Sequence, residues 1–268
     1  MERRTVYVGA SSLPRVKISK DHPRYRSLVT RERMAAMVEE GIVSTTGLIA
    51  HGRGEAFDYL LGETTVPEAD LAEKAAAAWL LRAERPVITV NGNAAALAAK
   101  ELGDLARATG ALVEINLFHR SEGRLRKVCD LVEEEMGMKV LGREQDAVLE
   151  GIASDRARCT SQGLLAADVV LIPLEDGDRA EAMAKAGKKV ISIDLNPLSR
   201  TTLAAEVAVV DELTRAVPNM VRWANELRNR PEEAQAVLAA FRNQENLAAV
   251  MRRICRGLRK GTADRSER

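Results

Sequence analysis

Apolar and polar residues follow two different periods along this chain, one in its first third and another after it. From Thr30 to about residue 84, apolar residues recur at helical spacing. One predicted helix ends at Gly41, which suits the left-handed residue after a helix, and another begins at Pro67, which suits a first helical turn. The first 18 residues have no clear period, and we treat them as an extension.

After Pro86, short apolar runs alternate with amphipathic stretches, as strands and helices do around a parallel sheet. Strand–helix–strand units need right-handed crossovers, which place helices on both faces of the sheet. The predicted strands cover 87–90, 111–118, 139–142, 167–174, 188–195 and 206–210, and the predicted helices cover 94–109, 121–137, 177–187 and 213–227.

The same pattern divides the chain into four parts. We expect an extension over 1–18, a helical part over 19–84 that packs on the core, a Rossmann-like core over 85–228, and a C-terminal helix and tail over 229–268. The predicted fold class is therefore α/β: a Rossmann-like parallel sheet with helices on both faces, an N-terminal helical segment and a long C-terminal helix. That last helix opens at Pro231 and frays after residue 260. Its apolar stripe is made of Leu247, Val250, Met251, Ile254 and Leu258.

The charge of the chain is balanced, with 40 Lys and Arg against 39 Asp and Glu. A nucleic-acid backbone is usually held by a basic patch, so we expect no nucleic-acid partner. No apolar run approaches the roughly 20 residues that span a bilayer, and the N-terminus lacks the apolar core of a signal peptide. The three cysteines have no CxxC spacing, and the three histidines have no metal-binding spacing. These features predict a cytoplasmic protein without a membrane partner, a disulfide framework or a zinc site.

Polar residues follow three of the predicted strands, and ligands of parallel sheets bind beyond the carboxyl ends of the strands. The three runs are 91–93 (Asn-Gly-Asn), 175–179 (Glu-Asp-Gly-Asp-Arg) and 194–200 (Asp-Leu-Asn-Pro-Leu-Ser-Arg). Two of them also have ordinary structural explanations. The run at 194–200 is typical of a turn, and the acidic run is typical of a helix cap, although it could also hold Mg²⁺.

The chain has neither a GxGxxG fingerprint nor a GxxxxGK[ST] loop, so other groups must hold any phosphates. Arg31 and Arg53 are candidates, because a guanidinium is a planar fork of donors that keeps its charge. Glycines flank Arg53 and would let a phosphate approach the backbone. The alternative is that both arginines form surface ion pairs. Further candidates are Asp194 and Asn196 for a ribose and an adenine edge, and Arg200 and Thr201 for phosphate.

Several longer segments together resemble one enzyme family in their order and spacing. They are 20–33, 47–63, 91–97, 114–120, 167–182 and 191–200, which include GLIAHGRGEAFDYLLGE and ISIDLNPLSR. Over about residues 20–228 the chain is similar to the archaeal phosphopantothenate synthetases, also called 4-phosphopantoate:beta-alanine ligases. Matches of this length are more specific than a lone short motif.

The resemblance implies the condensation of 4-phosphopantoate with beta-alanine to 4′-phosphopantothenate in coenzyme A biosynthesis. AMP and pyrophosphate would be released through an acyl-adenylate. The resemblance also implies a homodimer, with ATP as co-substrate and Mg²⁺ to offset the charge of the anions that meet. The implied ATP contacts are Arg31, Arg53, Asp194, Leu195, Asn196, Arg200, Thr201, Glu212 and Leu213.

The amine of beta-alanine must be neutral before it attacks, so the enzyme needs a base that accepts its proton. The candidate catalytic residues are His51, Glu55 and Asp58. The candidate substrate-binding residues are Lys20, His22, Arg24 and Arg120 for the phosphate and the carboxylate, with Asn91 and Asn93 to orient polar groups.

Two features depart from the family pattern. The polar stretch 143–163 lacks the Pro-rich, His-containing loop of the family, and His119 stands where a tyrosine is expected. Two other functions remain as alternatives. A nicotinamide-dependent reductase is disfavoured by the missing GxGxxG, whereas a dimeric nucleotide-binding sensor without turnover would keep the ATP positions and lose the substrate residues.

Overall fold

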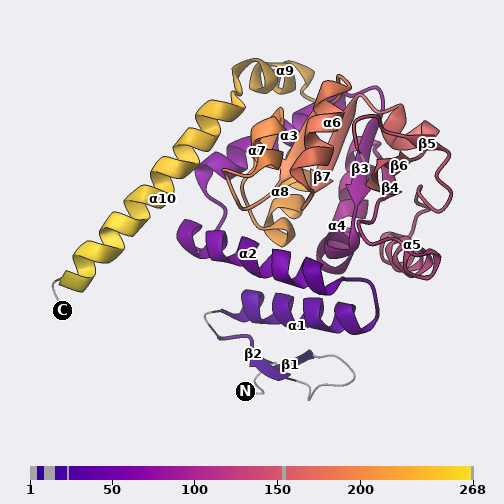
Figure 1. The fold of residues 1–268 in the computed structure, drawn as a ribbon. Helices are drawn as coiled ribbons and strands as arrows, with labels where there is room; N and C mark the ends of the chain where they lie inside the picture. The colour runs from indigo at the N-terminus through magenta and orange to yellow at the C-terminus, as the bar shows by residue number, and fades with distance from the viewer. Residues whose placement is uncertain (1–4, 9–15, 23, 153–154, 267–268) are drawn as a thin grey trace.

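A computed structural model describes residues 5–8, 16–22, 24–152 and 155–266. Its centre is a parallel sheet of five strands in the order β4-β3-β7-β8-β9 (Figure 1). The strands are β3 (Pro86–Val90), β4 (Leu112–Ile115), β7 (Val169–Pro173), β8 (Lys189–Ile193) and β9 (Val207–Val209). The chain reverses its direction of travel across the sheet after β4, so β3 and β7 form the switch point at which such folds bind ligands.

Both faces of the sheet are buried, as its Val- and Ile-rich strands require. One face, which includes Ile88 and Leu171, packs against α4 (Gly92–Thr109), α5 (Glu122–Met136) and α8 (Leu213–Leu227). The other face, which includes Val170 and Ile172, packs against α6 (Gly177–Lys185) and α10 (Asn243–Ser266). The predicted α/β sheet with helices on both faces is therefore confirmed.

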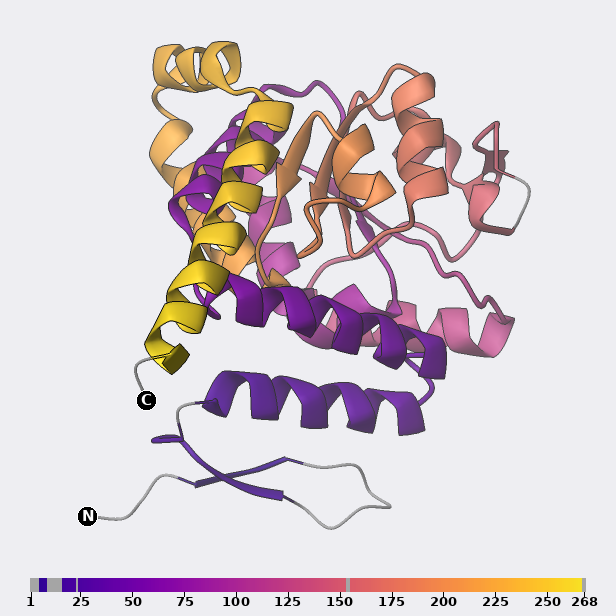
Figure 2. The same cartoon turned by 60° about the vertical axis from the view of Figure 1, so that its left-hand side comes forward.

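Two N-terminal helices, α1 (Tyr25–Glu39) and α2 (Thr45–Leu61), cover the carboxyl edge of this sheet. The third, α3 (Pro67–Arg82), packs beside α8 and β9. Figure 2 shows α2 running along the sheet edge with α1 on its outer side. Before them, β1 (Thr5–Val8) and β2 (Val16–Ser19) pair as an antiparallel hairpin within the predicted extension. Residues 1–4 and 9–15 of that extension lie outside the described residues.

The strand predicted at 139–142 is wrong. Leu141 makes a single parallel bridge to Glu114 at the edge of β4, through hydrogen bonds to Val113 and Ile115. Gly142 then turns away with φ +102°, and a Cβ there would lie 2.4 Å from the carbonyl oxygen of Ile115. The segment therefore touches the sheet at one point instead of extending it.

The single long helix predicted from Pro231 is also wrong, because the chain breaks it into α9 (Pro231–Ala240) and α10. Phe241 is extended at the break and only 9% exposed, so its ring joins the core. Asn243 starts α10 and ties it to the segment around β9. Its Oδ1 accepts a hydrogen bond from the N–H of Ala208, and its Nδ2 donates to the carbonyl oxygens of Thr202 and Ala205. The tail expected to fray is helical as far as Ser266.

The polar stretch 143–163 contains only short elements. They are β5 (Ala147–Val148), a 3₁₀ turn (Asp155–Ala157), β6 (Arg158–Cys159) and the start of a one-turn π-helix (Ser161–Leu165); α7 (Arg200–Ala204) follows β8. Residues 153–154 lie outside the described part. Among the described residues, no helix combines the length and the apolar character that crossing a bilayer requires.

Candidate functional site

A cavity of about 680 Å³ opens at the carboxyl edge of the sheet. Its floor consists of residues that follow β7, β8 and β9, and its roof of residues from α1 and α2. In Figure 2 these two helices lie below the strand ends, and they come from a part of the chain far from those strands. The volume falls in the range of pockets that hold small ligands and cofactors.

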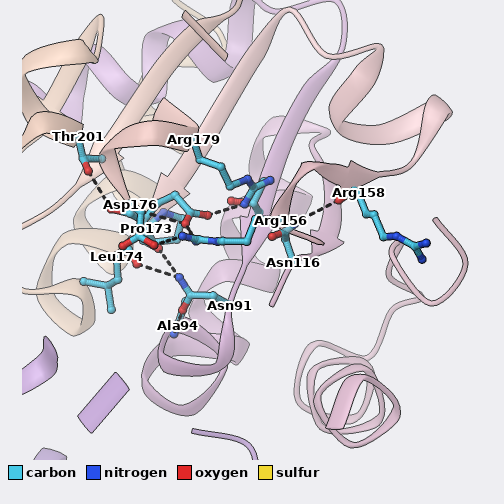
Figure 3. A network of polar contacts seen from close by, with 12 residues as sticks. Asn91, Ala94, Asn116, Arg156, Arg158, Pro173, Leu174, Asp176, Arg179 and Thr201 are labelled. Atoms are coloured by element: carbon cyan, nitrogen blue, oxygen red, sulfur yellow. Dashed lines mark hydrogen bonds and ion pairs between the residues drawn. The ribbon is translucent and has the colours of Figure 1, made fainter. Parts of the chain in front are cut away.

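At the switch point, Asn91 links the ends of β3 and β7 (Figure 3). Its Nδ2 donates to the carbonyl oxygens of Pro173 and Leu174 at 3.1 and 2.9 Å, while its Oδ1 accepts from the N–H of Ala94 and caps α4. Leu174 has φ +53°, a left-handed conformation that a non-glycine residue adopts only when its surroundings hold it. Asn91 therefore fixes the strained backbone where β7 enters the cavity.

The acidic run after β7 is held by two arginines (Figure 3). Arg156 donates to both Glu175 and Asp176, and the fully buried Arg179 donates to Glu175 at 2.5 Å. Asp176 is the residue before α6, but its side chain makes no capping hydrogen bond there. The run therefore lies at the helix start, as predicted, with Asp176 in the N-cap position, but its carboxylate pairs with Arg156 instead of capping α6.

The run after β8 forms two successive Asx turns. Asp194 Oδ1 accepts from the N–H of Asn196 at 3.0 Å, and Asn196 Oδ1 accepts from the N–H of Leu198 at 2.9 Å. Burial raises the pKa of Asp194, against its hydrogen bonds and the positive charge of Arg53. The turn interpretation is therefore confirmed, and the same residues also line the cavity.

The end of β9 supplies the last part of the floor. Glu212 caps α8, because its Oε2 accepts from the N–H and the hydroxyl of Thr214 at 2.9 and 2.5 Å. Burial raises the pKa of Glu212, against these hydrogen bonds and the charge of Arg215. Leu213 beside it is 1% exposed and belongs to the core as well as to the cavity wall.

Arg215 joins the floor of the cavity to its roof. It donates to the two carboxylate oxygens of Asp58 on α2 at 3.1 and 2.5 Å. It also donates from Nε and Nη2 to Asp211 Oδ1 at 3.0 and 2.6 Å. We call Asp58, Asp211 and Arg215 the carboxylate–arginine bridge. Breaking one partner of such a buried pair leaves an uncompensated charge, so the bridge holds α2 against α8.

His51 lies in the roof with no hydrogen-bond partner for its buried Nε2 among the described residues. Burial lowers the pKa of His51; Glu55, one turn later, opposes this effect, and Arg31 adds to it. Glu55 itself accepts from the hydroxyl of Ser27 at 2.8 Å. A neutral imidazole whose second nitrogen is not already hydrogen-bonded can accept a proton.

The described cysteines and carboxylates were compared with the arrangements that hold metal ions. Among the residues that the structure describes, no group of three or more His, Cys, Asp or Glu side chains is arranged to hold a metal ion. Cys129 and Cys159 are buried and free, and Cys255 is exposed.

Comparison with known proteins places the chain in a family. The family model described as "Phosphopantothenate/pantothenate synthetase" matches residues 68–257. The chain belongs to this family. A 4-phosphopantoate–beta-alanine ligase of Methanosarcina mazei is 48% identical over 248 residues, which cover 92% of this chain and 98% of that protein. The ligase of Methanospirillum hungatei is 55% identical over 78% of this chain and 86% of its own, and that of Thermococcus kodakarensis is 45% identical over 88% and 91%.

In this phosphopantothenate synthetase family member, most of the predicted site residues line this cavity. The cavity-lining residues among them are Lys20, Arg24, His51, Arg53, Glu55, Asp58, Asn93, Asp194, Leu195, Asn196, Arg200, Thr201, Glu212 and Leu213.

Four predicted residues do not line the cavity, and each has another position. Arg31 is exposed on α1, and Asn91 lies behind the cavity wall, where it supports Leu174. His22 accepts from the N–H of Arg24 at 3.0 Å in the loop before α1. Arg120 donates to Gln145 and to Glu122 beside α5.

The sequence analysis missed Asp211 and Arg215. Asp211 directly follows the strand predicted at 206–210, so it is a polar strand end like those after the strands at 87–90, 167–174 and 188–195. Arg215 lies four residues later on the same side of α8, which is the spacing of an ion pair along a helix. The pairing of Arg215 with Asp58, 157 residues away, has no local signal.

Proposed function

We propose that the chain is an ATP-dependent ligase that joins 4-phosphopantoate to beta-alanine. The products are 4′-phosphopantothenate, AMP and pyrophosphate, formed through an acyl-adenylate, in coenzyme A biosynthesis. One observation carries the proposal: nucleotide-binding candidates from α2 and from the ends of β8 and β9 line the same 680 Å³ cavity at the sheet edge. The names of the relatives support the same reaction.

ATP would lie along the floor of this cavity. Asp194 and Asn196 would read the ribose and the base, and Arg53 would reach the phosphates from the roof. In the structure, Arg200 donates two hydrogen bonds of 2.9 Å to Glu181 at the surface. When ATP binds, Arg200 would leave Glu181 and bind a phosphate instead. Thr201 holds the carbonyl of Glu175 at 2.8 Å and so ties the two floor loops together.

The activation step brings a carboxylate to the α-phosphate, so cations must offset the combined charge. Lys20 and Arg24 lie at the roof end of the cavity, where they would bind the phosphate or the carboxylate of 4-phosphopantoate. Mg²⁺ would enter with ATP, because it is commonly held by one or two carboxylates and by substrate phosphates. Asp176, whose side chain is 58% exposed in the cavity, would supply such a carboxylate. Mg²⁺ supplies charge neutralisation on the phosphates.

In the second step His51 would take the proton of the attacking amine. Its Nε2 has no hydrogen-bond partner among the described residues, and burial lowers the pKa of His51, which favours the neutral form that a base needs. The negative charge of Glu55, one turn away, would stabilise the protonated form of His51 after it takes the proton. Asp58 would have a different role from the one expected, because both its oxygens are bound by Arg215. It would hold the roof in place.

The homodimer implied by the family resemblance is part of the proposal. Sedimentation of the purified protein would give twice the chain mass of 29.2 kDa. A monomeric mass would contradict the proposed homodimer but not the proposed reaction, because the cavity is formed by residues of one chain.

The test measures AMP and pyrophosphate release with ATP, Mg²⁺, 4-phosphopantoate and beta-alanine, and omits each in turn. Release should require both substrates. His51→Ala should lower the rate of amide formation by roughly 100-fold, while exchange of pyrophosphate into ATP with 4-phosphopantoate alone stays near wild type. Arg126→Gln on the exposed face of α5 is the matched control. Demonstrable ATP binding without release would contradict the ligase.

A further inference from the structure

Glu73 lies on α3 with no exposed surface, on a helix face made mainly of alanine. Among the described residues, no N–H or O–H group donates a hydrogen bond to either of its carboxyl oxygens. An ionised carboxylate in that position would be very unfavourable, because a buried charge needs donors or a counter-charge. Nothing in the proposed reaction uses this residue directly.

The groups around Glu73 are mainly acidic. Asp211 at the end of β9 is close enough to hydrogen-bond with it, Asp70 lies one turn earlier on α3, and Asn219 of α8 offers an amide. Asp70 is itself bound by Arg222 of α8 at 2.9 Å. Burial, together with the negative charge of Asp211, raises the pKa of Glu73 to about 9. Glu73 is therefore a neutral acid at neutral pH, with one O–H to donate.

Asp211 has one place left for that donor. Its Oδ1 accepts from the N–H of Glu212 at 2.7 Å and from two nitrogens of Arg215. Its Oδ2 accepts only from the hydroxyl of Thr65, at 2.5 Å, among the residues described. A carboxylate offers about four lone-pair sites, two on each oxygen, so Oδ2 can take a second donor.

We propose that Glu73 is a positioning residue of the nucleotide site: its neutral carboxyl donates to Asp211 Oδ2 and so holds the carboxylate–arginine bridge in the cavity wall. The inference rests on the proposed function, because it assigns the bridge to an ATP site. It adds a residue from α3, which does not itself line the cavity, to the groups that determine the affinity for ATP.

The arrangement has a consequence for charge. With Glu73 neutral, Asp58 and Asp211 face the single cation Arg215. If Glu73 ionises, a further negative charge lies beside Asp211, repels it and raises the negative potential of a cavity that must accept the ATP anion. Affinity for ATP therefore falls as the pH rises past the pKa of Glu73.

The experiment compares ATP dissociation constants, measured by calorimetry without turnover, at about pH 7 and about pH 10, on either side of the pKa of about 9. Wild-type protein should bind about tenfold more weakly at the higher pH. Glu73→Gln keeps a donor for Asp211 and cannot ionise. It should therefore bind ATP like wild type at pH 7, and its affinity should fall much less than that of wild type between pH 7 and pH 10. Glu73→Leu keeps the volume but not the donor, so it should bind about tenfold more weakly at both values.

Circular dichroism confirms that each variant is folded, and Glu134→Gln on the exposed side of α5 is the matched control. A ¹³C NMR titration of the carboxyl carbons supplies a second readout: one resonance that titrates near pH 9 should be missing in Glu73→Gln. The proposal is overturned if both Glu73 variants bind ATP like wild type at both pH values, or if no such resonance exists. If wild-type protein does not bind ATP at all, the proposed function fails, whereas the NMR titration still decides the protonation of Glu73.

Discussion

Glu73 on α3 and Glu114 on β4 are both fully buried glutamates, but their surroundings are opposite. Glu114, on β4, accepts hydrogen bonds from the N–H and hydroxyl of Thr160 at 3.0 and 2.7 Å and from the N–H of Leu164 at 2.7 Å. Arg179 adds a positive charge near it. Neither carboxyl oxygen of Glu73 accepts a hydrogen bond in the described part of the chain, and the groups beside Glu73 are the amide of Asn219 and the acidic Asp211.

The difference shows that burial alone does not decide what a carboxyl group does. Burial raises the pKa of both residues, but for Glu114 the donors and Arg179 act against the rise. Glu114 thereby fixes the π-helix at 161–165, where Gly163 is needed because a Cβ would lie 2.2 Å from Glu114 Oε2. Glu73 instead serves as a donor to a carboxylate. Three substitutions test this difference between the two residues.

Glu114→Gln should have the largest effect, a loss of about 3 kcal/mol in the free energy of unfolding. The amide replaces one acceptor oxygen with a donor that faces other donors, and Arg179 loses its nearby negative charge. Chemical denaturation measures the loss, with Glu134→Gln as the exposed control. A change no larger than that of the control would mean that the three hydrogen bonds to Glu114 contribute nothing net.

Glu73→Gln should act in the opposite direction and stabilise the protein by about 2 kcal/mol near pH 6. The pKa of Glu73 is raised from 4.5 to about 9 on folding, so its contribution to stability is complete below pH 4.5 and is lost as the pH rises to about 9. The variant should therefore match wild type near pH 4.5 and exceed it increasingly up to pH 9. Thermal melts across this range test it, and a constant difference at all pH values would contradict the assignment.

Asp70→Asn should have the smallest effect. Removing this negative charge lowers the pKa of Glu73 by roughly half a pH unit, because Asp70 is partly exposed and already paired with Arg222. The midpoint of the Glu73 carboxyl resonance measures the shift. A rise of the midpoint would show that Asp70 does not act on Glu73 through its charge.

The sheet could be predicted from the sequence because its strands are continuous apolar runs. β7 is an example, with five buried residues in a row after Asp168. The two wrong predictions, a strand at 139–142 and a single helix from Pro231, have local causes that the spacing of apolar residues does not reveal. The segment around Leu141 has the residue types of a strand, but it pairs with β4 at one residue only. Phe241 interrupts a helical pattern because its ring packs in the core.

The candidate site was predictable where its residues follow strands. Asp194 and Asn196 lie directly after an apolar run, and their place in the cavity follows from the parallel topology. The carboxylate–arginine bridge was not predictable, since Asp58 and Arg215 are far apart in the chain and either could have been a surface residue. Glu73 looked like an ordinary polar residue in an alanine-rich helix, and only the packing of α3 against α8 and β9 buries it.

The roof of the cavity has a consequence for how the molecule opens. α1 and α2 contact the core chiefly through α4, α10 and the Arg215 bridge, so a ligand between roof and floor completes their packing. Such a segment opens locally at a lower free energy than the sheet, and a bound ligand suppresses that opening by mass action. A bound nucleotide would thus stabilise the packing of α1 and α2 on the core. Amide hydrogens of α2 would then exchange with solvent more slowly when more of the protein has nucleotide in the cavity.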